Sequence, residues 1–148
     1  MTRAEQAKEY FKQGYNCAQS VALAFTDLTG LSEKETARLA SSFGGGLGRM
    51  REVCGTVSGM ALVAGILFGY DDPKDQQGKS AHYALIQSLA GKFKEENGSI
   101  ICRELLGDRS QPTPTPEART PAYYKKRPCA ELVAVAAGIL EEYLASRK

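Results

Sequence analysis

Helix start and stop signals recur along the chain, and they constrain its fold more than any other feature. Ser32 is followed by Glu35 in the spacing of a capping box, and Asn97-Gly98 is typical of a helix end. Pro128 suits the first turn of a last helix, because proline lacks an N–H that would be unpaired there. Between these signals apolar residues recur at helical spacing, and no segment is convincing as a strand. The sequence therefore predicts an all-α fold.

Six or seven helices follow from these signals and from the apolar stripes between them. They are expected at about residues 3–13, 17–25, 33–43, 54–68, 76–96, 100–106 and from 128 onward. Alternating prolines over residues 111–116 favour an extended path, so we expect an exposed segment that crosses one face. We predict a compact helical bundle in which residues 1–148 form a single domain.

Four cysteines stand apart along the chain, and each lies at an expected helix start. They are Cys17, Cys54, Cys102 and Cys129. A helix N-terminus has unpaired N–H groups and a partial positive charge, so it stabilises a thiolate. Since no two of the cysteines form a C-x-x-C pair, only the fold could bring them to one site. We predict that the four sulfurs converge on one pocket that favours each thiolate, with at least one pair near disulfide distance.

Length and composition indicate the kind of protein and the cellular compartment in which this chemistry would take place. With 148 residues, of which 43% are hydrophobic, the chain has enough apolar side chains for a core without disulfides. The N-terminal residues are polar and helix-prone, so we expect no secretory leader and a cytoplasmic protein. A reducing compartment disfavours a permanent disulfide and favours metal binding or transient redox chemistry.

Charge and hydropathy argue against nucleic acid and membrane as partners. The 19 basic and 17 acidic residues are mostly interspersed and give a net charge of +2. The one basic cluster, Lys125-Lys126-Arg127, is interpreted as a solvated loop. The longest apolar stretch, residues 53–69, is interrupted by glycines and polar residues and is short for a membrane span, so we expect a buried helix.

Two glycine patterns and one histidine complete the candidate features. Residues 43–49 hold four glycines but lack the flanking strand or the Gly-Lys-Ser/Thr of a nucleotide site, which favours a structural or sulfur-approach loop. Gly55 and Gly59 share one helix face and predict close approach of another element. His82, the only histidine, is interpreted as a surface or boundary residue rather than a ligand.

The contexts of the cysteines resemble a known family. The blocks are NCAQSV at residues 16–21, CGTVSG at 54–59, CRELLG at 102–107, and Cys129 before a helix. Together they resemble the C_GCAxxG_C_C family over nearly the whole chain. The cysteine of its central block matches Cys54 and the trailing glycine matches Gly59, whereas Thr56 stands where an alanine is expected. The resemblance implies a small helical protein with four signature cysteines that is redox-active and has no settled reaction.

Three interpretations of the cysteines follow. The leading hypothesis is a thiol redox protein, or thiol–disulfide oxidoreductase, that cycles two or more of the four thiols. Of the three complete pairings, Cys17 with Cys54 is preferred because glycines give tight access. The alternative is a zinc or iron–sulfur site ligated by Cys17, Cys54, Cys102 and Cys129. The third interpretation is that the cysteines only fill the core. The redox partner or small-molecule substrate and the oligomeric state stay open.

Overall fold

The computed structural model describes residues 1–107, 112–126 and 128–147, and this part of the chain is built from helices. The elements are α1 (Arg3–Lys12), α2 (Cys17–Leu23), α3 (Thr26–Thr29), α4 (Glu33–Ala40), the 3-10 helix η1 (Ser41–Phe43), α5 (Gly55–Phe68), α6 (Gln76–Asn97), α7 (Cys102–Leu106), α8 (Pro121–Lys126) and α9 (Cys129–Ser146). The predicted all-α class is confirmed. An isolated antiparallel bridge between Val53 and Ile101 is the one β pairing among the described residues.

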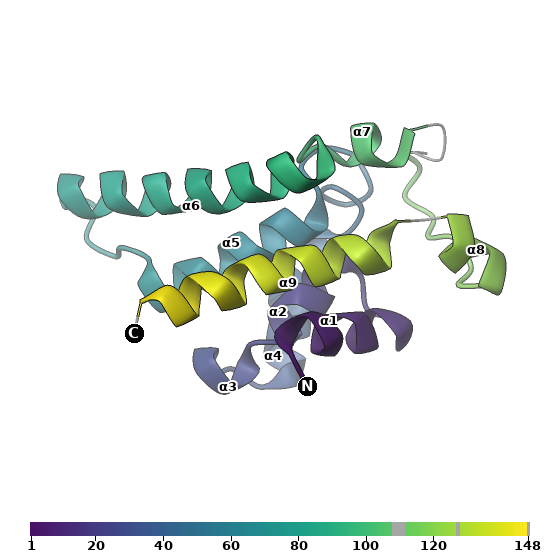
Figure 1. The fold of residues 1–148 in the computed structure, drawn as a ribbon, viewed down its shortest axis with the longest axis horizontal. Coiled ribbons are helices and arrows are strands. Elements are labelled where there is room, and N and C mark those ends of the chain that lie inside the picture. The colour runs from purple at the N-terminus through teal and green to yellow at the C-terminus, as the bar shows by residue number, and fades with distance from the viewer. Residues whose placement is uncertain (108–111, 127, 148) are drawn as a thin grey trace.

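Helix α2 lies at the centre of the bundle. It contacts α1, α4, α5 and α9, and α5 and α9 in turn contact α6 (Figure 1). All but two of its seven residues are buried, which fits a helix that is apolar nearly all round. The largest fully buried side chains come from several of these helices: Phe11, Phe25, Met60, Phe93 and Leu140. The core therefore joins the first and last helices of the chain.

The predicted helix boundaries hold where the capping chemistry is explicit. Asn16 caps α2 by accepting from the Gln19 N–H at 2.9 Å, and Ser32 caps α4 by accepting from Glu35 at 3.0 Å. Both form reciprocal capping boxes. Gly98 ends α6 in the left-handed conformation, with φ of 88°.

Two short helices were not predicted, so the expected number of helices was too low. The segment predicted as one helix over 17–25 ends at Leu23, because the N–H groups of Ala24 and Phe25 bond to carbonyls three residues back, and α3 follows. Helix α8 begins at Pro121, where the Thr120 hydroxyl accepts from the Tyr123 N–H at 3.2 Å.

The basic cluster that was interpreted as a loop begins inside α8. The backbone of Lys125 and Lys126 is helical, whereas their side chains and all of Arg127 lie outside what the structure describes. The solvated position of this cluster therefore stays a prediction.

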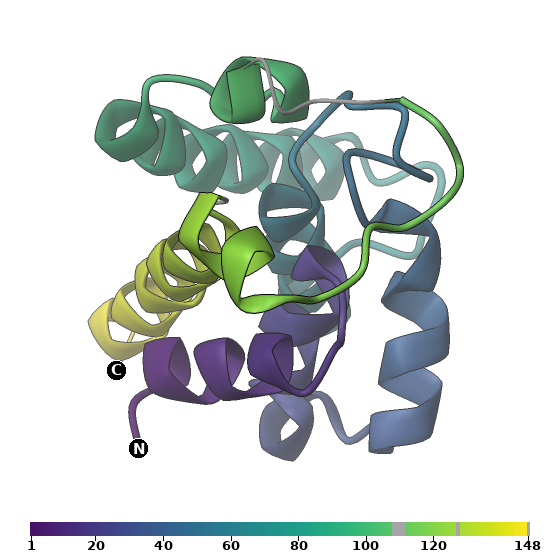
Figure 2. The same ribbon diagram turned by 90° about the vertical axis from the view of Figure 1, so that its right-hand side faces the viewer.

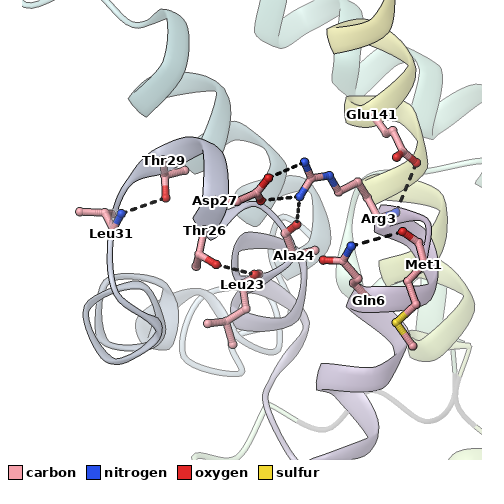
Figure 3. Close-up of polar contacts among 10 residues, drawn as sticks. All are labelled: Met1, Arg3, Gln6, Leu23, Ala24, Thr26, Asp27, Thr29, Leu31 and Glu141. Carbon is pink, nitrogen blue, oxygen red and sulfur yellow. Dashed lines mark hydrogen bonds and ion pairs between the residues drawn. The ribbon is translucent and has the colours of Figure 1, made fainter.

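Arg3 fastens the N-terminal helix to two other parts of the bundle (Figure 3). Its guanidinium donates to the Ala24 carbonyl at 2.7 Å and pairs with Asp27, while its backbone N–H donates to Glu141 of α9 at 3.3 Å. The hydrogen bond and charge of Arg3 lower the pKa of Asp27. The contact ties the start of α1 to the α2–α3 corner and to α9.

The beginnings of α5, α7, α8 and α9 gather at one end of the molecule (Figure 1). Seen from that end, residues 112–120 cross the face between α7 and α8 (Figure 2). This is the crossing segment that the prolines predicted. Within the described residues, no helix is both long enough and apolar enough to cross a bilayer.

Candidate functional site: a cavity lined by four cysteines

One cavity of about 450 Å³ is lined by all four cysteines. Cys17, Cys102 and Cys129 are the first residues of α2, α7 and α9, and Cys54 is the N-cap of α5. Cys54, Cys102 and Cys129 are buried, and Cys17 is partly exposed. The predicted convergence of the four segments on one pocket is confirmed. None of these four cysteines is in a disulfide.

Cys17 and Cys129 interact within the cavity. A hydrogen bond with the Cys129 side chain is the largest cause of a pKa for Cys17 well above that of an ordinary thiol. Burial adds to the rise, followed by the charges of Cys129, Cys54 and Cys102. The sequence preferred Cys54 as the partner of Cys17, whereas Cys129 affects the pKa of Cys17 more than Cys54 does.

A short backbone bridge places Cys54 beside the segment that holds Cys102. The Cys54 N–H donates to the Ile100 carbonyl at 2.7 Å, and the Cys102 N–H donates to the Glu52 carbonyl at 2.6 Å. At the exposed side of the same bridge, Arg103 and Glu52 form an ion pair at 3.2 Å. Residues 52–54 and 100–102 therefore act as one unit that presents two cysteines to the cavity.

Arg51 supplies a positive charge to the sulfur of Cys102. Its side chain is buried, and Nη1 donates to Cys102 Sγ at 3.6 Å. The backbone of Arg51 is left-handed, with φ of 64°, and its carbonyl accepts from the Arg103 N–H at 3.3 Å. A guanidinium at this distance stabilises a thiolate more than a thiol.

Glycines let two chain segments, the loop that holds Gly46 and helix α5, come close to elements that carry cysteines. A Cβ on Gly46, whose φ is 74°, would lie 2.8 Å from Cys102 Cβ. A Cβ on Gly55 would lie 3.3 Å from Cys17 Cβ, and one on Gly59 would lie 2.7 Å from the Ala18 carbonyl oxygen. The predicted close approach at Gly55 and Gly59 is confirmed, and the element that approaches is α2.

The pocket does not favour the thiolate of every cysteine, so that prediction was wrong. Besides the raised pKa of Cys17, burial raises the pKa of Cys54 to about 11, although the Thr56 hydroxyl, 3.1 Å from the Cys54 sulfur, opposes the rise. Removal from water disfavours a charged sulfur, and it is the largest cause of the rise at Cys54, whereas at Cys17 it comes second to the Cys129 side chain.

One comparison with known proteins shows the family of this chain. The family model described as "Putative redox-active protein (C_GCAxxG_C_C)" matches residues 15–143. The chain belongs to the C_GCAxxG_C_C family. The comparisons with curated proteins and with solved structures returned no match.

The match to the C_GCAxxG_C_C family runs from just before Cys17 to beyond Cys129, so all four cysteines of the cavity lie inside it. The description of this family as redox-active agrees with thiols gathered at one site. A role as inert core residues accounts for the burial of Cys54, Cys102 and Cys129. It does not account for the polar groups at two of the sulfurs, which are Arg51 at Cys102 and the Thr56 hydroxyl at Cys54.

The four-thiolate metal site stays a prediction. Within residues 1–107, 112–126 and 128–147, no three His, Cys, Asp or Glu side chains are arranged to hold a metal ion. His82 is not among the lining residues and packs edge-on against Tyr70 of the α5–α6 turn.

Four further side chains of the cavity were not predicted: Arg49, Arg51, Arg119 and Tyr123. Arg49 is the last residue of the glycine-dense stretch and Arg51 lies two residues beyond it, and neither has a local pattern that marks a site. Arg119 follows the prolines, where no local signal marks it. Burial raises the pKa of Tyr123 to about 12, so this phenol stays neutral at physiological pH.

Proposed function

We propose that this protein is a thiol–disulfide redox protein in which Cys129 is the nucleophile and Cys17 the resolving thiol. The observation that carries the proposal is that Cys17 and Cys129, the first residues of α2 and α9, line one cavity, where the Cys129 side chain is the largest cause of the raised pKa of Cys17. A proton that Cys17 holds toward Cys129 stabilises negative charge on Cys129. Cys129 is also the first residue of α9, an 18-residue helix whose N-terminal N–H groups favour a thiolate.

The reaction with a low-molecular-weight disulfide, RS–SR, balances in two exchanges. The Cys129 thiolate attacks one sulfur, forms Cys129–S–S–R and expels RS⁻, which takes up a proton. Cys17 then loses its proton and attacks the Cys129 sulfur, forming the Cys17–Cys129 disulfide and expelling the second RS⁻. Two protein thiols are oxidised, and one small disulfide is reduced to two thiols that carry the two protons.

The raised pKa of Cys17 suits the resolving role. While Cys129 holds charge, it keeps the proton on Cys17 through the hydrogen bond and through its negative charge. Once Cys129 enters a mixed disulfide, that charge is gone, so both effects on Cys17 weaken. Cys17 is then easier to deprotonate at the stage when its attack is required.

Trapping the mixed disulfide tests the assignment of the two roles. The reduced protein is treated with bis(2-hydroxyethyl) disulfide, which is neutral, and the adducts are mapped by peptide mass spectrometry. Cys17→Ser should accumulate the adduct on Cys129, because the resolving thiol is missing, and Cys129→Ser should leave Cys17 largely unmodified. Adducts on Cys17 in the Cys129→Ser protein at the wild-type rate would reverse the two roles.

Cys54→Ser is the matched comparison, because it removes the partner that the sequence preferred but keeps both proposed reacting thiols. This variant should still form the Cys17–Cys129 disulfide. Loss of that disulfide in folded Cys54→Ser would instead support Cys17–Cys54 cycling.

A further inference from the structure

One extended segment lies between the cysteine cavity and solvent. The crossing segment of residues 112–120, which we call the strap, passes over the end of the molecule where α5, α7 and α9 begin (Figure 2). Pro114, Pro116, Glu117 and Arg119 of the strap line the cavity, and the first three of them are also exposed. A residue that borders both the cavity and water belongs to the cover of the cavity.

The strap buries little of its own surface. None of residues 112–120 is buried, and residues 112–118 are all exposed. Its alternating prolines lack the N–H groups through which an extended segment pairs with a neighbour. A segment with few buried side chains opens at a lower free energy than the core beneath it. The strap can therefore move away from the cavity without unfolding the bundle.

Arg49 holds the middle of the strap. Its guanidinium donates to the carbonyls of Thr113 and Thr115. It also donates to the Thr113 hydroxyl at 3.2 Å and lies 3.7 Å from the Glu117 carboxylate. A planar guanidinium has several donors in a fixed arrangement, which suits it to hold several acceptors of one segment. Only 15% of the Arg49 side chain is exposed, so water competes poorly for these bonds.

The backbone of Arg49 supports a positioning role for its side chain. Its φ is 62°, in the left-handed region that favours glycine. The Arg49 N–H donates to the Gly44 carbonyl at 3.1 Å, which helps to fix this conformation. A residue other than glycine keeps such a backbone only where the surrounding structure stabilises it, and such residues cluster at functional sites.

Arg119 fixes the far end of the strap to the core. It donates to the carbonyls of Phe11 and Tyr15 at 3.1 and 3.0 Å, and its guanidinium lies 4.3 Å from the ring centre of the buried Phe11. Release of Arg49 would therefore free the middle of the strap, while Arg119 would keep its end in place.

The cysteines under this cover are accessible only through the cavity. Cys54, Cys102 and Cys129 are each at most 7% exposed. The cavity volume of about 450 Å³ lies in the range of small-molecule sites. A disulfide on the surface of a folded protein belongs to a much larger body, so it cannot reach these sulfurs while the strap is in place.

We infer that the strap is a size filter that admits compact low-molecular-weight disulfides to the cavity, and that Arg49 is the positioning residue that keeps it closed. The inference rests on the thiol chemistry proposed above and names the size class of its substrate. With Arg49 bonded to the strap, a compact disulfide reaches Cys129 and a bulky one does not. Release of Arg49 opens the cavity to larger reactants.

Two maleimides of different bulk test the filter. N-ethylmaleimide and N-pyrenylmaleimide are both neutral, and a thiolate adds to the same double bond in each, so the thiolate population cancels in the ratio of their rates. Peptide mass spectrometry measures this ratio, bulky reagent over small reagent, at Cys102 and Cys129. In the folded, reduced protein it should lie about tenfold or more below the ratio in the urea-unfolded chain, because only the bulky reagent requires local opening.

Variants locate the source of the exclusion. Arg49→Gln should raise the ratio several-fold and Arg49→Lys should keep part of the exclusion, whereas Arg38→Gln, the same change at the exposed end of α4, should leave the ratio unchanged. Loss of a positive charge near the thiols would by itself slow both reagents, so faster reaction with N-pyrenylmaleimide identifies opening. If Arg49→Gln does not fold, Pro114→Gly combined with Pro116→Gly should raise the ratio, because glycine gives the exposed strap more conformations.

The possible failures can be told apart. A wild-type ratio equal to the unfolded ratio would overturn the size filter, even if bis(2-hydroxyethyl) disulfide still links Cys17 to Cys129. A low ratio that neither Arg49→Gln nor the double proline variant changes would also overturn it, because the fixed walls of the cavity would then exclude the bulky reagent. A low ratio that these variants raise, without any disulfide formation, would leave the filter in place and defeat the proposed redox function.

Discussion

Three sulfurs of the cavity have distinct polar neighbours, and these neighbours separate the chemistry of the thiols. Cys17 interacts with Cys129, the sulfur of Cys54 lies 3.1 Å from the Thr56 hydroxyl, and that of Cys102 lies 3.6 Å from Arg51. The pKa values of Cys17 and Cys54 are raised, whereas Cys102 faces a positive charge. Cys17 and Cys54 should therefore react slowly with alkylating agents at neutral pH.

Cys54 provides a pH test of this distinction. Its pKa of about 11 predicts slow alkylation by iodoacetamide at pH 8, with a rate that rises about tenfold per pH unit until the thiol titrates. Thr56→Val removes a hydroxyl that lowers the pKa of Cys54, so it should shift the rate profile further toward alkaline pH. The measurement is the alkylation rate of the Cys54 peptide by mass spectrometry. A wild-type profile centred at or below pH 9 would contradict it.

The positions of the cysteines could be predicted from the sequence, but not their titration. Helix starts can be recognised from Asn16 and Pro128, and so can the partial charge at each terminus. Desolvation depends on which distant segments cover a residue, and the contact of Cys17 with Cys129 joins the two ends of the chain. Neither the desolvation of a cysteine nor its contact with a distant residue leaves a local pattern in the sequence.

At the scale of elements, the close packing of α5 on α2 sets the shape of the cavity wall. Gly55 and Gly59 turn a face without side chains toward Cys17 and Ala18, which lets the two helices approach at the level of the backbone. The bridge between residues 52–54 and 100–102 adds the second wall. The packing of α5 on α2 and the bridge between residues 52–54 and 100–102 each place a cysteine at the end of the packed element.

Gly59→Leu should destabilise the protein by about 2 kcal/mol or more, because its Cβ alone would lie 2.7 Å from the Ala18 carbonyl oxygen. Gly65→Ala is the matched control in the same helix, since nothing lies within 4 Å of its added Cβ. The control should stabilise by roughly 0.5–1 kcal/mol through helix propensity. Urea denaturation measures both. An unchanged midpoint for Gly59→Leu would refute the packing.

Among the elements, the sequence predicted those that are marked by a cap, a terminal glycine or an apolar stripe. It missed α3, where bonds to carbonyls three residues back interrupt the helix that starts at Cys17. It also missed α8, because Thr120-Pro121 lies in a segment dominated by prolines. Both depend on local bonding that apolar periodicity does not report.

For the whole molecule, the fold gathers at one end four thiols and three arginines that are dispersed in the sequence. The convergence of the cysteines could be predicted from their shared context, and the family match covers the same span. The arginines could not, because Arg49, Arg51 and Arg119 come from a loop and a crossing segment whose placement depends on tertiary contacts.

The most direct test of the account is to map the first disulfide that the wild-type protein forms. The reduced protein is treated with one equivalent of bis(2-hydroxyethyl) disulfide, the remaining thiols are blocked at low pH, and the disulfide-linked peptides are identified by mass spectrometry. The account predicts a Cys17–Cys129 link, with Cys54 and Cys102 recovered as blocked thiols. A first link between Cys17 and Cys54, or four blocked thiols with no link, would contradict it.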